Sequence, residues 1–186
     1  MDKGASSYRR FREEGDESGL AEIIDTYRDG LIFYLNSYVC NILIAEELAE
    51  DVFVLLGTKK PKDKGKGSFK TWLYTIGRNL AINHLRRAKR HSHLSVDDCP
   101  EQATEEDALE QQYIKEEQKI TVHRCLRKLK PEYRQVLWLL YFEEFSTKEV
   151  ATALNKSVHN IETLTYRARK ALKAQLETEG ITYEEP

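Results

Sequence analysis

A lysine-rich tract followed by two aromatic residues carries the clearest chemistry in this sequence. Residues 59–67 read KKPKDKGKG, and Phe69 and Trp72 follow directly. Lysine displaces the counterions condensed on a nucleic acid, and aromatic rings offer surfaces on which unstacked bases can stack. The tract therefore indicates a basic track beside which single-stranded bases are held. Its candidate DNA contacts are Lys62, Lys64, Lys66, Phe69 and Trp72.

Charge is strongly segregated along the chain, although the net charge is only −2. Residues 56–95 hold eleven Lys and Arg against the single acid Asp63, whereas residues 96–117 hold nine acids against the single base Lys115. Local fields steer partners more than net charge does. A basic block for nucleic acid is thus followed by an acidic block that avoids it.

The composition favours a helix-rich chain without an enzyme's active site. The 186 residues are 40% hydrophobic and 32% charged, with nine Gly and four Pro. No apolar run reaches the roughly 18 to 20 residues that cross a bilayer, and residues 1–16 are too charged for a signal peptide. The sequence has no P-loop, GxSxG or HExxH motif. We therefore expect a cytoplasmic protein without direct membrane insertion, with neither catalytic residues nor a cofactor.

The three cysteines are widely spaced and form no CxxC pair. We expect three reduced thiols and no metal site. A metal site built from His91, His93 and Cys99, or from His123 and Cys125, is the weaker alternative, because sparse pairs do not fix a tetrahedral geometry.

Three amphipathic helices are expected in the first half of the chain. Residues 20–38 and 45–56 place apolar side chains at three- and four-residue spacing, and the tract 59–67 then interrupts the pattern. Residues 68–90 resume it as a basic helix with aromatics near its start. These helices can bury their apolar faces against one another.

The second half begins with a linker and ends with a helix-turn-helix. Residues 91–110 contain Pro100, many acids and few large apolar side chains, so they cannot form a core of their own. Helical patterns return from about residue 111 and again over residues 132–142. The sequence STKE at residues 146–149 predicts a capping box for a short helix to about residue 154, and Ser157 can cap a longer last helix. A short helix, a tight turn and a longer helix form a helix-turn-helix.

Two separate blocks resemble the extracytoplasmic-function sigma factors, group IV of the sigma-70 superfamily. AEELAEDVF (residues 45–53) with FKTWLYTIGRNLAINHLRR (69–87) is similar to their promoter-melting domain. Residues 126–155, with YRARKAL at 166–172, are similar to their minus-thirty-five-reading domain. The resemblance implies an all-α chain of two small helical domains joined by a flexible acidic linker, the second domain containing the helix-turn-helix. Residues 1–92 would form the first domain, 93–112 the linker and 113–186 the second.

The resemblance also assigns roles to individual residues. The loop before Phe69 would receive a flipped base of the minus-ten element, while Asn79, Arg86 and Arg87 approach the upstream end of that element. Further roles in DNA reading fall on Glu162, Thr163, Tyr166 and Arg167, and roles in binding polymerase fall on Glu47, Glu50 and Asp51. Family members commonly have Gln in place of Glu50 and basic residues in place of Glu162. The implied partners are core RNA polymerase, promoter DNA and, as the family commonly has one, an anti-sigma factor.

Several plainer interpretations stay open on the sequence alone. Phe69 and Trp72 have the spacing of core residues, and the tract 59–70 has the composition of a solubilising loop. A conventional helix-turn-helix regulator that acts without core polymerase would account for the second block but not for the first. An all-helical adaptor would leave the mixture of aromatic and basic residues unexplained.

Overall fold

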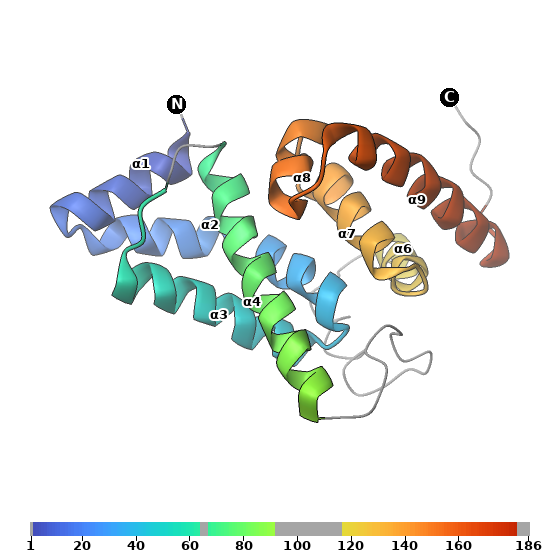
Figure 1. Ribbon diagram of the computed structural model, residues 1–186, viewed down its shortest axis with the longest axis horizontal. Helices are drawn as coiled ribbons and strands as arrows, with labels where there is room; N and C mark the ends of the chain where they lie inside the picture. Colours follow the sequence, from blue (N-terminus) through green and yellow to red (C-terminus); the bar gives the residue numbers. More distant parts are fainter. Residues whose placement is uncertain (1, 64–66, 92–116, 182–186) are drawn as a thin grey trace.

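The computed structural model describes residues 2–63, 67–91 and 117–181, and these residues form helices and connecting turns (Figure 1). The expected linker and the positions of Lys64 and Lys66 lie outside the described residues. No strand occurs within the described ranges. The predicted all-α class is therefore confirmed.

The chain begins with two helical segments that the sequence analysis missed. They are α1 (Lys3–Arg9) and the π-helical turn η1 (Arg10–Glu14), and they precede α2 (Glu17–Val39). Tyr8 and Phe11 are 4% and 7% exposed. These two rings attach an otherwise polar segment to the bundle, and ring burial of this kind contributes strongly to helix stability.

The first helical bundle consists of α2, α3 (Ile42–Lys59) and α4 (Phe69–His91), close to the three helices expected from the sequence. The Asn41 side chain caps α3 by accepting a hydrogen bond from the Ile44 N–H at 2.9 Å. All three helices contribute completely buried side chains to one core, as their apolar spacing predicts. These side chains include Leu31, Leu35, Val52, Leu56 and Leu73.

The second bundle contains α6 (Glu117–Arg127), α7 (Pro131–Leu137), the π-helical turn η2 (Trp138–Phe142), α8 (Thr147–Leu154) and α9 (Val158–Thr178). The single helix expected over residues 132–142 is in fact α7 followed by η2. The Glu143 N–H donates to the Trp138 carbonyl, the five-residue step of a π-helix. This wider turn ends the helix just before Glu143.

Helix α4 also contacts the second bundle, where it lies beside α8, and α2 contacts α7 and η2 (Figure 1). Aromatic rings pack across this junction. Phe33 of α2 lies 5.5 Å from Trp138, and Tyr74 of α4 lies 5.3 Å from Phe145. The two bundles therefore form a closed arrangement held by direct contacts.

Phe69 is a core residue, so the prediction that its ring is open to a base is wrong for this structure. It is 1% exposed, and its ring packs 5.5 Å from Tyr8, 5.8 Å from Tyr27 and 5.5 Å from Trp72. The Phe69 N–H also donates to the Asp2 carboxylate at 2.6 Å. The plainer interpretation of Phe69 is the correct one, because the unexpected helix α1 covers it.

We expect Phe69→Ala to lower the free energy of unfolding by about 3–5 kcal/mol, because the substitution removes a buried ring and leaves a cavity. Urea denaturation followed by circular dichroism measures this loss. Tyr166→Ala is the control, since Tyr166 is 71% exposed and its loss should change stability by less than about 0.5 kcal/mol. Equal losses in both variants would contradict the core role of Phe69.

Candidate nucleic-acid and polymerase interfaces

Helices α8 and α9 form the expected helix-turn-helix. The capping box is present, because the Glu149 N–H donates to Ser146 Oγ at 3.3 Å while the Ser146 N–H donates to Glu149 Oε2 at 3.0 Å. Asn155 takes the left-handed conformation (φ 52°) that ends α8, and Ser157 then caps α9. A tight turn between two capped helices presents the second helix at the surface.

The outward face of α9 carries all four of its predicted DNA contacts. Ile161 and Ala168 are completely buried and point to the core. The exposed positions one turn apart are Glu162, Thr163, Tyr166 and Arg167. Since packing does not use these side chains, they are available to a partner in the closed arrangement.

Helix α4 presents a second exposed set, formed by Asn79, Arg86 and Arg87. Lys62, in the loop before α4, is exposed as well. Trp72 is half-buried against Tyr8 at 5.3 Å, so its ring serves the core and leaves one part accessible. The cations and Asn79 therefore remain surface groups, whereas the aromatic residues at the start of α4 mainly hold α1 in place.

Helix α3 has an acidic stripe that ends in apolar residues. Glu47, Glu50 and Asp51 are exposed, as the sequence predicts. Leu43 and Val54 flank them at helical spacing and are 48% and 59% exposed. The sequence analysis missed these two residues, although both fall outside the inward apolar pattern of α3. Exposed apolar side chains beside charges are typical of a protein-binding surface.

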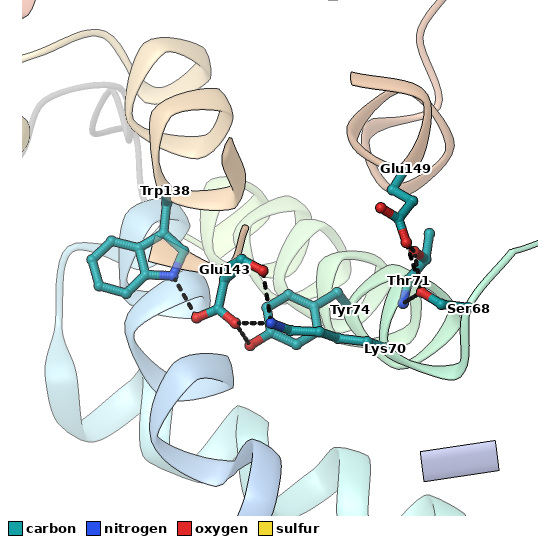
Figure 2. Close-up of polar contacts among 7 residues, drawn as sticks. All are labelled: Ser68, Lys70, Thr71, Tyr74, Trp138, Glu143 and Glu149. Carbon is teal, nitrogen blue, oxygen red and sulfur yellow. Dashed lines mark hydrogen bonds and ion pairs between the residues drawn. The ribbon is translucent and has the colours of Figure 1, made fainter. Parts of the chain in front are cut away.

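A polar cluster at the junction of the two bundles was not predicted either (Figure 2). The Glu143 carboxylate, 8% exposed, accepts hydrogen bonds from the Tyr74 hydroxyl at 2.6 Å and from Trp138 Nε1 at 3.3 Å. It also pairs with Lys70 Nζ at 2.8 Å, and Lys70 donates to the Glu143 carbonyl at 2.8 Å. One carboxylate of the second bundle thus binds two side chains of α4.

Glu149 makes a second polar contact to α4 (Figure 2). Its Oε1 accepts from Ser68 Oγ at 2.9 Å and lies 3.4 Å from Thr71 Oγ1. Burial acts to raise the pKa of Glu149, but the hydrogen bonds from Ser146, Ser68 and Thr71 outweigh it and lower the pKa from 4.5. The ionised form therefore fits the folded state.

Arg134 makes a third contact across the junction. Its side chain extends from α7 to the C-terminal end of α2. It is 4% exposed and donates to the carbonyls of Ser37, Arg127 and Leu129 and to Cys40 Sγ. Burial, together with the nearby charge of Arg127, lowers the pKa of Arg134 to about 10. A cation at a helix C-terminus is favourable, so this contact stabilises the closed arrangement.

The cysteine and histidine expectations require one correction. Cys40 is disulfide-bonded, so the expectation of three reduced thiols is wrong. Cys125 is a free, buried thiol whose pKa is raised by burial, and Cys99 lies outside the described residues. Within the described residues no cluster of three metal-ligating side chains occurs, and His123 packs against the rings of Phe33 and Trp138.

Comparisons with known proteins identify the family. The family model for sigma-70 region 2 matches residues 23–91, and that for sigma-70 region 4 matches residues 119–172. The chain is 29% identical over 175 residues to the ECF RNA polymerase sigma factor SigW of Bacillus subtilis, covering 88% of this chain and 92% of SigW. It is 30% identical over 159 residues to the RNA polymerase sigma factor YlaC of the same organism, covering 84% of this chain and 91% of YlaC.

Solved structures share the fold. The sigma factor RpoE in complex with the anti-sigma factor NepR from Bartonella quintana superposes with a TM-score of 0.67 and 18% identity, covering 84% of this chain and 96% of RpoE. CnrH in complex with the cytosolic domain of CnrY gives a TM-score of 0.63 and 20% identity, covering 95% of this chain and 97% of CnrH.

The chain belongs to the extracytoplasmic-function sigma factors of the sigma-70 family. It is an alternative sigma factor, which directs promoter recognition by RNA polymerase. A conventional regulator is not favoured, because residues 23–91 match region 2 of a sigma factor. Sigma factors are transcription initiation factors, not classical enzymes. No described helix is long and apolar enough to span a membrane.

We expect Glu149→Gln to remove an acid-sensitive part of the stability. Because the pKa of Glu149 is lowered on folding, its contribution is present above about pH 4.5 and is lost as the pH falls through the folded-state pKa. The free energy of unfolding of the wild type should exceed that of the variant by about 1 kcal/mol at pH 7, and the difference should shrink as the pH falls below 4.5. Urea titrations at several pH values measure the difference. A constant difference across that range would contradict this role, and Glu177→Gln on the exposed face of α9 is the control.

Proposed function

We propose that three exposed surfaces of this sigma factor bind different partners. Helix α9 reads the minus-thirty-five element, and α4 with its preceding loop binds the minus-ten element. Helix α3 binds core polymerase. The observation that carries the proposal is that each helix buries an apolar face and leaves a set of polar or charged side chains unused by packing. Residues on rigid helices hold their geometry better than residues on loops.

The α9 surface is suited to the major groove. Its exposed face lies in the N-terminal half of the second helix of a helix-turn-helix, the part nearest the bases in this motif. Arg167 can bind a phosphate or guanine, and Glu162 can accept a hydrogen bond from cytosine N4. Glu162 thus gives this helix a base preference that a basic residue would not.

The α4 surface supports the melting function. Arg86, Arg87 and Lys62 supply positive charge for the DNA backbone, and Asn79 supplies a side chain that can hydrogen-bond a base edge. Trp72 is the remaining candidate for base stacking, since part of its ring stays accessible. In this proposal Phe69 packs in the core beneath this surface and does not contact DNA.

The α3 surface combines charge with exposed apolar side chains. Glu47, Glu50 and Asp51 provide a negative field that orients a basic partner, and Leu43 and Val54 add apolar contact area at both ends. The proposed partner is core RNA polymerase, which carries out the catalysis. The sigma factor itself would act in the cytoplasm without a cofactor.

An anti-sigma factor is a further proposed partner. Structural neighbours of this chain are the sigma factor RpoE, solved with the anti-sigma factor NepR, and CnrH, solved with the cytosolic domain of CnrY. The proposed units are a first domain over residues 1–92, a linker over 93–112 and a second domain over 113–186.

We expect Glu47→Lys with Asp51→Lys to weaken binding of core polymerase at least tenfold, because the double substitution reverses the field of α3. Fluorescence anisotropy with labelled sigma factor and purified core enzyme measures the dissociation constant. The matched control is Asp25→Lys with Glu177→Lys, which makes the same charge change at exposed positions elsewhere. If both double variants bind core equally, α3 is not the binding surface.

We expect Glu162→Ala and Arg167→Ala to have separable effects. Loss of a base contact should reduce discrimination by about 1–3 kcal/mol at one base pair, whereas loss of a phosphate contact should weaken all sequences and lower the salt slope by about one. Binding of holoenzyme to every single substitution of the minus-thirty-five element distinguishes the two effects. An unaltered base profile for Glu162→Ala would show that this carboxylate does not read sequence.

A further inference from the structure

Cys40 and Arg134 form a sulfur–guanidinium pair that the proposed function does not use. Arg134 Nη2 donates a hydrogen bond to Cys40 Sγ at 3.2 Å. Cys40 lies at the end of α2 in the left-handed conformation (φ 52°), and it is half-buried. The sulfur therefore has a fixed cation beside it while part of the residue stays accessible to small molecules.

The guanidinium of this pair is deeply buried and is short of negative charge. Arg134 is 4% exposed, and its other N–H groups donate to the carbonyls of Ser37, Arg127 and Leu129. Within the described residues no carboxylate pairs with it, and the charge that shifts its pKa is the like charge of Arg127. Its pKa of about 10 still leaves it a cation at neutral pH. A buried cation is costly without a counter-ion, and a thiolate at Cys40 supplies one.

A neighbouring guanidinium makes a cysteine more reactive. The thiolate, and not the thiol, attacks oxidants and electrophiles, and cysteines beside Arg or Lys favour the thiolate form. The end of α2 acts against this with its partial negative charge, but Arg134 already binds one of the terminal carbonyls, that of Ser37. A full positive charge in hydrogen-bond contact outweighs the remaining partial charge. The geometry therefore favours a nucleophilic sulfur at Cys40.

Cys125 shows the opposite environment in the same chain. It is a free, completely buried thiol, and burial together with the charge of Glu179 raises its pKa. It therefore stays protonated at neutral pH and is shielded from reagents. Of the two described cysteines, Cys40 alone has the surroundings of a reactive one.

The disulfide at Cys40 is a second, independent observation. In the cytoplasm, where this chain is proposed to act, disulfides are rare, and those that form are usually transient and either catalytic or redox-sensing. The chain has three cysteines, and Cys125 is free. By this count the second sulfur of an intrachain disulfide is that of Cys99, which lies outside the described residues.

We propose that Cys40 is a redox-sensitive site that reacts with hydroperoxides, that Arg134 is its positioning residue, and that the disulfide is its oxidised state. The Cys40 thiolate attacks the terminal oxygen of the hydroperoxide, so that an S–O bond forms, the O–O bond breaks and the alkoxide leaves as an alcohol with a proton from water. The product is a sulfenic acid. A second thiolate then attacks its sulfur, forming the S–S bond, and hydroxide leaves as water after taking up a proton. The two thiols are oxidised together and the hydroperoxide is reduced.

This inference goes beyond the proposed function, because it involves none of the three surfaces assigned to DNA and polymerase. Its experiments use the purified chain without DNA or core enzyme. Failure of the promoter or polymerase assignments would therefore leave the result at Cys40 unchanged, and the reverse also holds.

The rate of thiol alkylation tests the reactivity of Cys40. The reduced, full-length wild-type chain is pulsed with iodoacetamide at pH 7, and mass spectrometry of its peptides measures the alkylation of each cysteine. Cys40 should react about fivefold or more faster in the folded chain than in the same chain unfolded in urea, whereas Cys125 should react more slowly when folded. If folding slows the reaction of Cys40 or leaves it unchanged, the proposal is overturned.

Substitution of Arg134 tests the cause of that reactivity. Arg134→Gln should slow the alkylation of Cys40 about tenfold, and Arg134→Lys, which keeps a positive charge, should retain most of the wild-type rate. Arg9→Gln is the matched control, because it removes a charge of the same kind at an exposed position of α1. Circular dichroism checks that each variant is folded, and the wild-type comparison decides the proposal even if Arg134→Gln does not fold. A folded Arg134→Gln chain that reacts as fast as the wild type would remove Arg134 from the proposal.

Treatment with hydrogen peroxide tests the oxidised state. One equivalent added to the reduced wild-type chain should produce an intrachain disulfide between Cys40 and Cys99, mapped by mass spectrometry of unreduced peptides. Cys40→Ser should abolish the disulfide, while Cys125→Ala should leave it intact. A disulfide that contains Cys125, a disulfide that forms between chains, or a Cys40 thiol that stays reduced in the wild type would each overturn the proposal.

Discussion

Helix α4 contacts three parts of the structure at once: the core of the first bundle, the N-terminal residues and α8. The arrangement of the other helices depends on these contacts. Its inward side chains, such as Leu73, fill the core against α2 and α3. Its first turn is covered by the N-terminal residues, with the Phe69 N–H bound to Asp2. The same turn meets α8 through Ser68. The exposed side that remains, with Asn79 and the two arginines, is the one proposed to meet DNA. One helix therefore combines core packing, the contact with the N-terminal residues and the contact with α8.

Local signals in the sequence were enough to predict the elements with strong caps or strong periodicity. The sequence STKE fixes the start of α8 because the capping bonds are made within four residues, and Ser157 does the same for α9. Helix α1 was missed because its stability comes from distant partners. Tyr8 donates a hydrogen bond to the Pro61 carbonyl and packs on Phe69 and Trp72, contacts that no local pattern records. For the same reason the sequence left open whether Phe69 contacts DNA or lies in the core, where the structure places it.

The junction shows a second limit of sequence patterns. Glu143 and Glu144 are neighbours of identical type in the segment YFEEF. One has a side chain that is 8% exposed between the bundles, and the other is exposed to solvent. The π-helical turn before them sets the direction in which each side chain points, and the single helix expected over residues 132–142 would have pointed them elsewhere. By contrast, the surface positions on α3 and α9 were predictable because they follow from helical periodicity alone.

Glu149 lets α8 keep its own cap while it also binds residues at the start of α4. Its two oxygens serve different purposes: Oε2 accepts from the backbone and hydroxyl of Ser146 and completes the capping box, whereas Oε1 accepts from Ser68 and Thr71 of α4. The capping bonds are made entirely within residues 146–149, so the start of α8 does not depend on α4. The contact with α4 therefore adds to the helix-turn-helix without being needed to form it, which is why the capping box could be predicted from four residues of sequence while the contact with Ser68 could not.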